Sequence, residues 1–321
     1  MATPSSVFTE MVTTTLRQHP SEIADAVSNH NALYRRLAAK SRVTKVDGGY
    51  EIVKPLEYAE NATYQRYSGY DTLNINASDV LTAAKYEWMQ AAVHVVASGR
   101  ELRMNSGKNQ IIDLAASRVK NAIRTAANNQ SVDMYSDGAL TNQIGGLAHL
   151  IQTNGAGTVG GINAGTWSNW ANQYLEIPGT NAVTKSNIKG FMNTLWLATN
   201  RGTDKPDLIV MTHDFFGFYW ESLQDLQRYA SSDSATAGFQ SLKYVSADVM
   251  FDSNSNFSTT GERAYFLNTD YIEMVVHSQA NWSQIDEKTS VNQDAVVIPI
   301  IWQGNLCLSN RRLQGIMIDA S

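Results

Sequence analysis

The feature that most constrains the fold of this sequence is an extended segment, residues 43–75, with strand chemistry but few aliphatic side chains. Within it, Asp47–Gly49 lies between two β-rich stretches, Val43–Val46 and Tyr50–Val53, which predicts a hairpin turn. A two-stranded ribbon of this composition buries too little apolar surface to be stable alone. We therefore expect it to pack against something else, either the body of its own chain or a neighbouring chain.

Tyrosines recur along this segment and are interleaved with charged side chains. Aromatic rings can stack on single-stranded bases, but such platforms come with a positively charged groove. The formal net charge of the chain is −5, and no local run of Lys and Arg offsets it, so nucleic-acid binding of that kind is not expected. We interpret these aromatic residues as buried in a core or in contacts between subunits.

The rest of the chain predicts a mixed α and β body, which its length allows to be one large domain or two smaller ones. Ala84–Ala97 begins with alternating charged and aromatic residues and then becomes apolar on both faces, as expected of a strand that enters a core. An apolar stripe within Asn105–Asn129 predicts a helix. About 25 residues at 1.5 Å each give a rod of roughly 37 Å, long enough to span the molecule as a spine.

Both ends of the chain have simpler patterns. Two short helices, separated by Pro20, are expected before residue 42. From residue 184 onward helices alternate with strands, and the residues after 242 read mostly as strands. The short link Thr269–Asp270 between two apolar stretches predicts a hairpin.

Composition excludes several classes of protein. Hydrophobic residues make up 43% of the chain and charged residues 17%, which indicates a folded chain rather than a disordered one. Cys307 is the only cysteine, so an intrachain disulfide and a cysteine-based metal cluster are excluded. The longest apolar stretch, Ala295–Trp302, is too short to span a bilayer, and the first residues lack the features of a signal peptide. We expect a soluble protein from a reducing compartment, with no membrane contact.

A glycine-rich stretch, Gly155–Gly160, matches the G-x-G-x-x-G pattern of dinucleotide-binding proteins. Such a site needs a helix whose N-terminus meets the pyrophosphate. The residues that follow, Gly161–Thr166, are a poor helix former. The pattern therefore favours a flexible glycine loop, and a nucleotide-dependent enzyme is the alternative.

The remaining candidates for chemistry are histidines and aspartates. No two of the six histidines have a spacing typical of metal ligands, and His94, on an apolar strand, is interpreted as a core residue. Asp204, Asp207 and Asp214 cluster around a strand end, where α/β enzymes place carboxylates. The simpler interpretation puts Asp204 in a turn and Asp214 in the first turn of a helix, where it favours the dipole. We predict no catalytic, cofactor-binding or metal-binding residue.

Several phrases, in a fixed order along the chain, resemble those of a known family. They are Tyr135–Gly138 with Ile144–Leu147, then Arg201–Leu208, then Tyr265–Tyr271, and finally Gly304–Leu306 with Asn310–Gly315. Together with the extended segment, the long helix and the final strands, they make nearly the whole chain resemble a tailed-bacteriophage major capsid protein with the HK-ninety-seven-type shell fold.

The resemblance implies an α+β fold and a division of the chain. The implied parts are an N-terminal arm (1–41), an extended β-hairpin loop (42–79), a peripheral domain with a long spine helix (80–137), an α/β axial domain (138–249), and return strands of the peripheral and axial domains (250–321). In this arrangement the hairpin loop would lie across an adjacent subunit. The implied intersubunit contacts are Lys45, Tyr50, Glu51, Lys54, Tyr58, Tyr64, Arg66 and Tyr67.

The implied function is structural rather than enzymatic and needs no cofactor. Subunits would assemble in the host cytoplasm, through pentamers and hexamers, into the icosahedral head shell of a virion. The shell would enclose double-stranded phage DNA without sequence-specific binding. Implied partners are a portal, decoration proteins and a separate scaffolding protein if one is used. No fused scaffold is expected, because only a short segment precedes the second helix.

Two further readings stay open. In this family a loop lysine can be cross-linked to a neighbouring subunit, which would concern Lys45 or Lys54. An unreacted, solvated lysine is the alternative. Within the same fold, an encapsulin-like cellular compartment that stores an enzyme is the alternative function. A dinucleotide-binding enzyme using Gly155–Gly160 is the alternative from a different class.

Overall fold

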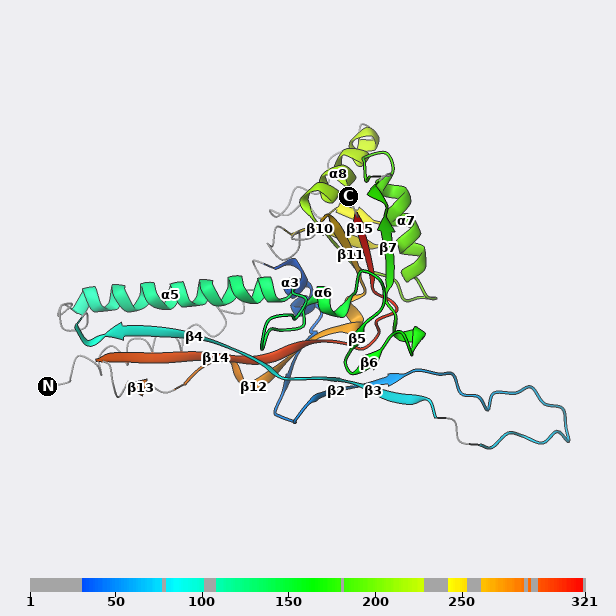
Figure 1. Ribbon diagram of the computed structural model, residues 1–321, viewed down its shortest axis with the longest axis horizontal. Coiled ribbons are helices and arrows are strands. Elements are labelled where there is room, and N and C mark those ends of the chain that lie inside the picture. Colours follow the sequence, from blue (N-terminus) through cyan, green and yellow to red (C-terminus); the bar gives the residue numbers. More distant parts are fainter. Residues whose placement is uncertain are drawn as a thin grey trace.

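The computed structural model describes residues 31–76, 79–100, 108–179, 182–227, 242–252, 261–285, 288–289 and 294–319. The described chain has an α+β fold in three parts (Figure 1). A long sheet lies along a long helix, a six-stranded sheet with two helices stands beside them, and a two-stranded arm projects away from the long helix. The predicted helix before Pro20 and the start of the second helix lie outside the described residues.

The long sheet is built around two strands, β12 (Ile272–Gln284) and β14 (Ala295–Leu308), which pair antiparallel. Its other strands are β1 (Val43–Val46), β13 (Lys288–Thr289) and β4 (Met89–Ser98). β4 pairs with β14 along its whole length, from Ser98 opposite Ala295 to Met89 opposite Gly304. This sheet is the platform from which the other two parts extend.

Helix α5 (Lys108–Asp133) lies along β4 and β14 (Figure 1). Its buried face includes Val119 and Ile123, and it shares a core with Val95 of β4 and Ile298 of β14. The Arg118 guanidinium also donates to the Val96 carbonyl and so ties the helix to the strand. The long spine helix predicted from the apolar stripe is confirmed, with bounds shifted by a few residues toward the C-terminus.

The six-stranded sheet mixes parallel and antiparallel pairs. Its order is β7 (Gln173–Ile177), β15 (Gly315–Asp319), β11 (Arg263–Leu267), β8 (Leu208–Met211), β10 (Ala247–Phe251) and β9 (Leu242–Tyr244). Helices α7 (Ile188–Thr199) and α8 (His213–Gln227) pack against it, with Met192 and Phe215 in the shared core. Asp214 lies in the first turn of α8, as predicted.

Strand β8 is buried on both faces and joins the two cores. Leu208 and Val210 belong to the core under the long sheet, whereas Ile209 and Met211 belong to the core under α7 and α8. The alternation follows from the period of a strand, whose successive side chains point to opposite faces. Because both faces of β8 are buried, its sequence Leu-Ile-Val-Met is apolar at every position.

The arm consists of β2 (Ile52–Glu57) and β3 (Leu81–Tyr86), paired antiparallel from Ile52 opposite Tyr86 to Glu57 opposite Leu81. The chain between them forms the outer part of the arm, away from the body (Figure 1). Shorter elements complete the fold. They are α3 (Ala32–Ala39), α6 (Leu147–Leu150), β5 (Thr158–Val159), β6 (Ile162–Asn163) and the 3₁₀ turns Ser168–Trp170 and Thr269–Tyr271.

The hairpin predicted at Asp47–Gly49 is wrong. β1, before the turn, pairs in parallel with β12, and β2, after it, pairs with β3. The turn therefore carries the chain from the long sheet into the arm. Gly48 and Gly49 have φ of 150° and 121°, values that glycine adopts without strain. The glycines mark where the chain bends, but the pairing of each strand is decided by residues distant in the sequence.

Other local predictions are corrected in the same way. The single strand Ala84–Ala97 is two strands, β3 and β4, interrupted at Glu87–Trp88 where the chain leaves the arm. The hairpin at Thr269–Asp270 is instead a 3₁₀ turn that leads from the six-stranded sheet to the long sheet. His94 is exposed, because alternate residues of β4 point away from α5.

Within the described ranges, no helix is both long and apolar enough to cross a membrane. Among these residues no cluster of His, Cys, Asp and Glu is arranged to hold a metal ion. The Gly155–Gly160 stretch is followed by β6 in a two-stranded ribbon with β5, not by a helix. The dinucleotide-site alternative therefore lacks the helix N-terminus that it needs.

Candidate intersubunit site

The outer part of the arm exposes large aromatic side chains. Tyr64, Tyr67 and Tyr70 are 80%, 66% and 106% exposed, and Ile75 is 91% exposed. An exposed apolar group of this kind is typical of a surface that is covered by a partner. In the residues described here, the arm buries its side chains only near its base.

The base of the arm is tied to the long sheet by an ion pair. Lys54 Nζ of β2 lies 2.5 Å from Glu273 Oε2 of β12, and both side chains are about one-fifth exposed. Burial raises the pKa of Glu273, but the hydrogen bonds from Lys54 and Thr44 outweigh this effect. The pKa of Glu273 therefore lies below its ordinary value. Glu273 is therefore held ionised against Lys54.

Strand β3 is tied to the end of β14 by a buried tyrosine. The Tyr86 hydroxyl donates to the Leu308 carbonyl at 2.8 Å and accepts from the Leu308 amide at 3.2 Å. Burial raises the pKa of Tyr86 well above its ordinary value, so the phenol stays protonated. Next along the chain, Asn305 Nδ2 donates to the Glu87 carbonyl at 2.9 Å. These bonds fix the point at which the arm leaves the body.

The glycine loop supports β3 from the other side. The Lys85 amide donates to the Gly160 carbonyl at 3.0 Å. A Cβ on Gly160 would lie 2.8 Å from the Ala84 Cβ, and Gly160 has φ of 58°. Only glycine fits both the close approach and the backbone conformation. The G-x-G-x-x-G pattern thus serves a packing contact with the arm.

Arg311 holds the glycine loop in place from the interior. Its side chain is fully buried and donates to the backbone carbonyls of Leu150 at 2.8 Å and Ala156 at 2.6 Å. Gly157 and Trp170 accept weaker bonds at 3.5 Å. Burial lowers the pKa of Arg311 to about 10, which leaves the guanidinium charged at neutral pH. Sequence reasoning missed Arg311, because a single arginine carries no pattern.

A groove with a volume of about 1410 Å³ opens between the arm base and the body. Its lining comes from both arm strands, from the loop after β6, from the end of α7 and from the link between β14 and β15. Tyr58 at the arm side and Trp167 at the body side meet edge to face, with ring centroids 5.2 Å apart. Asn169 Nδ2 also donates to the Tyr58 carbonyl at 3.3 Å.

The predicted intersubunit residues fall into three groups. Tyr64, Arg66 and Tyr67 are exposed on the outer arm, and Tyr50 is exposed at the turn before β2. The second group, Glu51, Lys54 and Tyr58, contacts its own chain. Glu51 Oε2 lies 3.3 Å from Lys85 Nζ. Lys54 is paired with Glu273, and the Tyr58 ring packs on Trp167. Lys45 is exposed on β1, apart from the arm. Lys54 is thus not the solvated lysine of the alternative reading.

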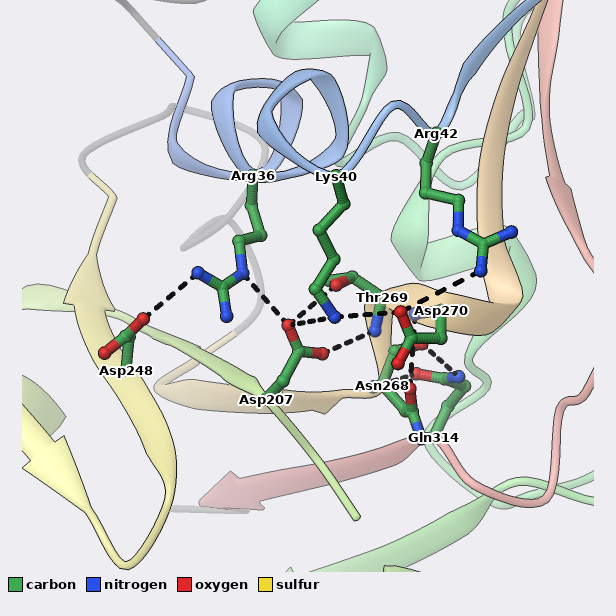
Figure 2. Close-up of polar contacts among 9 residues, drawn as sticks. All are labelled: Arg36, Lys40, Arg42, Asp207, Asp248, Asn268, Thr269, Asp270 and Gln314. Carbon is green, nitrogen blue, oxygen red and sulfur yellow. Dashed lines mark hydrogen bonds and ion pairs between the residues drawn. The ribbon is translucent and has the colours of Figure 1, made fainter. Parts of the chain in front are cut away.

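The aspartates around β8 do not form one site. Figure 2 shows Asp207 between α3 and the Thr269–Tyr271 turn. It accepts from Arg36 Nε at 3.0 Å, and Thr269 donates to it from both its amide and its hydroxyl, at 2.6 and 2.7 Å. Lys40 Nζ lies 3.0 Å away.

Burial raises the pKa of Asp207, but the hydrogen bonds from Thr269 and Lys40 outweigh it and leave the pKa below its ordinary value. Asp204 instead accepts from the Tyr271 hydroxyl at 2.9 Å. Asp214 is exposed at the start of α8. The arrangement supports a joint between α3 and the six-stranded sheet, with Arg36 also 3.2 Å from Asp248 (Figure 2).

Comparison with solved structures identifies the fold. The chain is similar to the capsid subunit of cyanophage A-1(L), with 13% identity, a TM-score of 0.58, and coverage of 87% of this chain and 91% of that chain. It is similar to the SrpI encapsulin of Synechococcus elongatus PCC 7942, with 8% identity, a TM-score of 0.55, and coverage of 88% and 86%. It is also similar to a structure from Mycobacterium phage Bobi, with 10% identity, a TM-score of 0.53, and coverage of 88% of this chain and 90% of that chain.

No family model and no curated protein matches the sequence. The structural likeness nevertheless extends over nearly the whole chain and over nearly the whole of each neighbour. The chain has the HK-ninety-seven-type shell fold, the fold of tailed-phage major capsid proteins. The resemblance found in the sequence is confirmed at this level.

Proposed function

We propose that the protein is a major capsid protein whose copies assemble into the icosahedral head shell of a tailed phage. The observation that carries the proposal is the arm, whose base is anchored on its own body and whose outer tyrosines are exposed. If the exposed arm of each subunit contacts the next subunit, the same head-to-tail contact is repeated from copy to copy. Repeated contacts of this type can close into rings and shells. The likeness to the capsid of cyanophage A-1(L) and to the structure from Mycobacterium phage Bobi supports the same function.

Within this function we assign the outer arm to contacts with the neighbouring subunit in pentamers and hexamers. Of the predicted contact residues, Tyr64, Arg66 and Tyr67 are exposed on the outer arm. The division into an N-terminal arm, hairpin loop, peripheral domain, axial domain and return strands is retained as part of the proposal. A portal, decoration proteins and a separate scaffolding protein are the expected partners, and the role is structural rather than catalytic.

The proposed cargo is double-stranded DNA, enclosed without sequence-specific binding. The net charge of −5 suits this role, because a protein that neutralises few phosphates binds DNA weakly. The shell would form in the host cytoplasm and be part of the virion.

Particle formation tests the proposal directly. The purified protein, with its scaffold if one is used, is expected to form closed particles of on the order of hundreds of subunits, measured by size-exclusion chromatography with light scattering and by negative-stain microscopy. A stable monomer under all assembly conditions would contradict it.

A second candidate is an encapsulin-like compartment, which the likeness to the SrpI encapsulin favours. Both candidates predict closed particles, so the contents separate them. Particles isolated from the natural source and treated with nuclease should retain double-stranded DNA if the protein is a phage capsid. An encapsulated enzyme without protected DNA would favour the compartment.

A further inference from the structure

The residue before the glycine loop forms the only Asn-Gly pair in the sequence, Asn154–Gly155. Asparagine is one of the thermolabile residues of proteins. It is most labile before glycine, because no side chain on the next residue obstructs attack of that residue's amide nitrogen on the asparagine Cγ. The Asn154 side chain is exposed, whereas Gly155 is buried. A reactive side chain that water can reach is therefore joined to a main chain that the fold holds.

The fold requires glycine at position 155. Its φ is 69°, in the left-handed region that favours glycine. A Cβ at this position would lie 2.8 Å from the Asn172 carbonyl oxygen and 3.1 Å from the Tyr174 ring. A bulkier residue would protect Asn154 but does not fit, so packing against the segment at the start of β7 keeps the labile pair in the chain.

A turn restrains both reacting groups. The Gly155 amide donates to the Gln152 carbonyl at 3.1 Å, and Asn154 Oδ1 accepts from the Ala156 amide at 3.0 Å. The Asn172 side chain fixes Gln152 on both sides, because it accepts from the Gln152 amide at 3.0 Å and donates to the Gln152 carbonyl at 2.8 Å. The Gly155 nitrogen must leave the Gln152 carbonyl before it can lose its proton. Reaction therefore needs a local opening of the turn.

Asn163 of β6 offers a comparison within the same chain. Its side chain is exposed, and its Oδ1 accepts from the Gly165 amide at 2.7 Å, as Asn154 accepts from the amide two residues on. The Ala164 amide donates to the Gly157 carbonyl at 3.1 Å, so the next nitrogen is also restrained. The residue after Asn163 is alanine, however, and its methyl group obstructs attack on Cγ.

We propose that Asn154 is a site of spontaneous deamidation and that the turn slows the reaction in the folded protein. The Gly155 nitrogen forms a bond to Asn154 Cγ, the Cγ–Nδ2 bond breaks, and ammonia leaves with the proton that the Gly155 nitrogen loses. Water then opens the succinimide ring. Attack at Cγ gives aspartate, and attack at the main-chain carbonyl carbon gives isoaspartate.

Isoaspartate lengthens the main chain by one methylene group between Asn154 and Gly155. Two residues further on, the Ala156 carbonyl accepts from Arg311 Nη2 at 2.6 Å. At the end of the same loop, the Gly160 carbonyl accepts from the Lys85 amide at 3.0 Å. We expect the lengthened loop to weaken both contacts, so the modified protein should be less stable than the original.

The first experiment locates the reaction. The folded protein is incubated in heavy-oxygen water at mildly alkaline pH and is then digested with pepsin. Tandem mass spectrometry measures the heavy oxygen that hydrolysis leaves at positions 154 and 163. At least about tenfold more label is expected at Asn154 than at Asn163, because the alanine methyl hinders the second site. Equal labelling of the two sites, or none at either, would overturn the proposal.

The same measurement in guanidinium chloride tests the turn. Labelling of Asn154 should be faster in the unfolded chain, in which the Gly155 nitrogen is free of the Gln152 carbonyl. A rate in the folded protein that equals or exceeds the rate in the unfolded chain would overturn the role of the turn.

The second experiment measures the effect on stability with Asn154→Ser and Asn163→Ser. Serine keeps a side-chain oxygen for each turn but has no amide to lose, and circular dichroism shows that each variant is folded before incubation. After incubation, the melting temperature of the wild type and of Asn163→Ser should fall by about 2–4 °C, whereas that of Asn154→Ser should stay constant. An equal fall in Asn154→Ser would overturn the expected effect of the modification.

Discussion

Lys54 Nζ lies 2.5 Å from Glu273 Oε2, an ion pair that joins the arm to the long sheet across 219 residues of sequence. Both side chains are largely buried, so neither can replace its partner fully with water. The angle at which the arm leaves the body therefore depends on a contact between β2 and β12. The same base is held by Tyr86 and by the glycine loop.

Lys54→Met should lower the free energy of unfolding by about 1–3 kcal/mol, because it leaves the largely buried Glu273 without its ammonium partner. Urea denaturation followed by circular dichroism measures the change. Lys45→Met is the matched control, since Lys45 is exposed on β1 and its loss should cost less than about 0.5 kcal/mol. Equal effects of the two substitutions would contradict the role of the ion pair.

Acid should weaken the protein through Glu273 and Asp207. The pKa of each carboxyl is lowered in the folded state, so their stabilisation is complete above the unfolded pKa and is lost as the pH falls through the folded pKa. The free energy of unfolding should therefore decrease from about pH 5 to about pH 3.

Glu273→Gln and Asp207→Asn should each flatten that decrease, measured by urea denaturation at several pH values. Asp214→Asn is the control, because Asp214 is exposed on α8. An unchanged slope in both of the first two variants would show that these carboxyls are not the groups responsible.

Arg311→Met should destabilise the fold by more than about 3 kcal/mol, because it removes the only buried guanidinium that satisfies the carbonyls of Leu150 and Ala156 among the residues described. Arg312→Met, its exposed neighbour, should leave the melting temperature nearly unchanged. Thermal melts followed by circular dichroism compare the two. Comparable melting temperatures for both variants would contradict the role assigned to Arg311.

Gly160→Ala and Gly161→Ala separate a steric contact from backbone strain. Both glycines have positive φ, but a Cβ at Gly160 would meet Ala84 and Tyr86, whereas at Gly161 nothing lies within 4 Å. Gly161→Ala should cost about 1 kcal/mol from strain alone. Gly160→Ala should cost clearly more and should also reduce the yield of particles, because it displaces β3 at the arm base. Equal losses in urea denaturation would mean that the loop does not position the arm.

Replacing residues 61–76 by a short Gly-Ser linker should leave the body folded but prevent assembly. The base contacts of Lys54 and Tyr86 lie outside the deleted residues, so the melting temperature should change by less than about 4 °C. Sedimentation should show only monomers or small oligomers. Particles of normal size from this variant would show that the arm tip is not the main contact between subunits.

The elements that could be predicted from the sequence are those whose pattern is local. The spine helix has its apolar stripe in consecutive turns, and the buried run Leu208–Met211 indicates its own strand. The sequence predicts the bend at Asp47–Gly49 correctly. It does not predict how the flanking strands pair, because the partner of β1 is the distant strand β12. The hydrogen-bond partners of Tyr86 and Arg311 are likewise distant in sequence. Residues that meet only in the folded chain leave no periodic pattern in the sequence of either segment.

The environment of the arm tyrosines could be predicted only in part, because the sequence left a core and a contact between subunits as alternatives. Tyr64, Tyr67 and Tyr70 stand in a segment too poor in aliphatic residues to form a core, and that shortage is visible in the sequence itself. The groove could not be predicted, because its lining comes from five separate stretches of chain. Asp207 looked like a member of a carboxylate cluster for the same reason: its partner Arg36 on α3 is 171 residues away.

The double burial of β8 has a mechanical consequence. Because Leu208 and Val210 pack in one core and Ile209 and Met211 in the other, the strand is a stiff coupling through which force on one part of the body reaches the other. Twisting the two parts against each other would open both cores at once. We therefore expect the subunit to change its shape more readily along the outer arm, whose side chains are exposed, than between the two parts of the body.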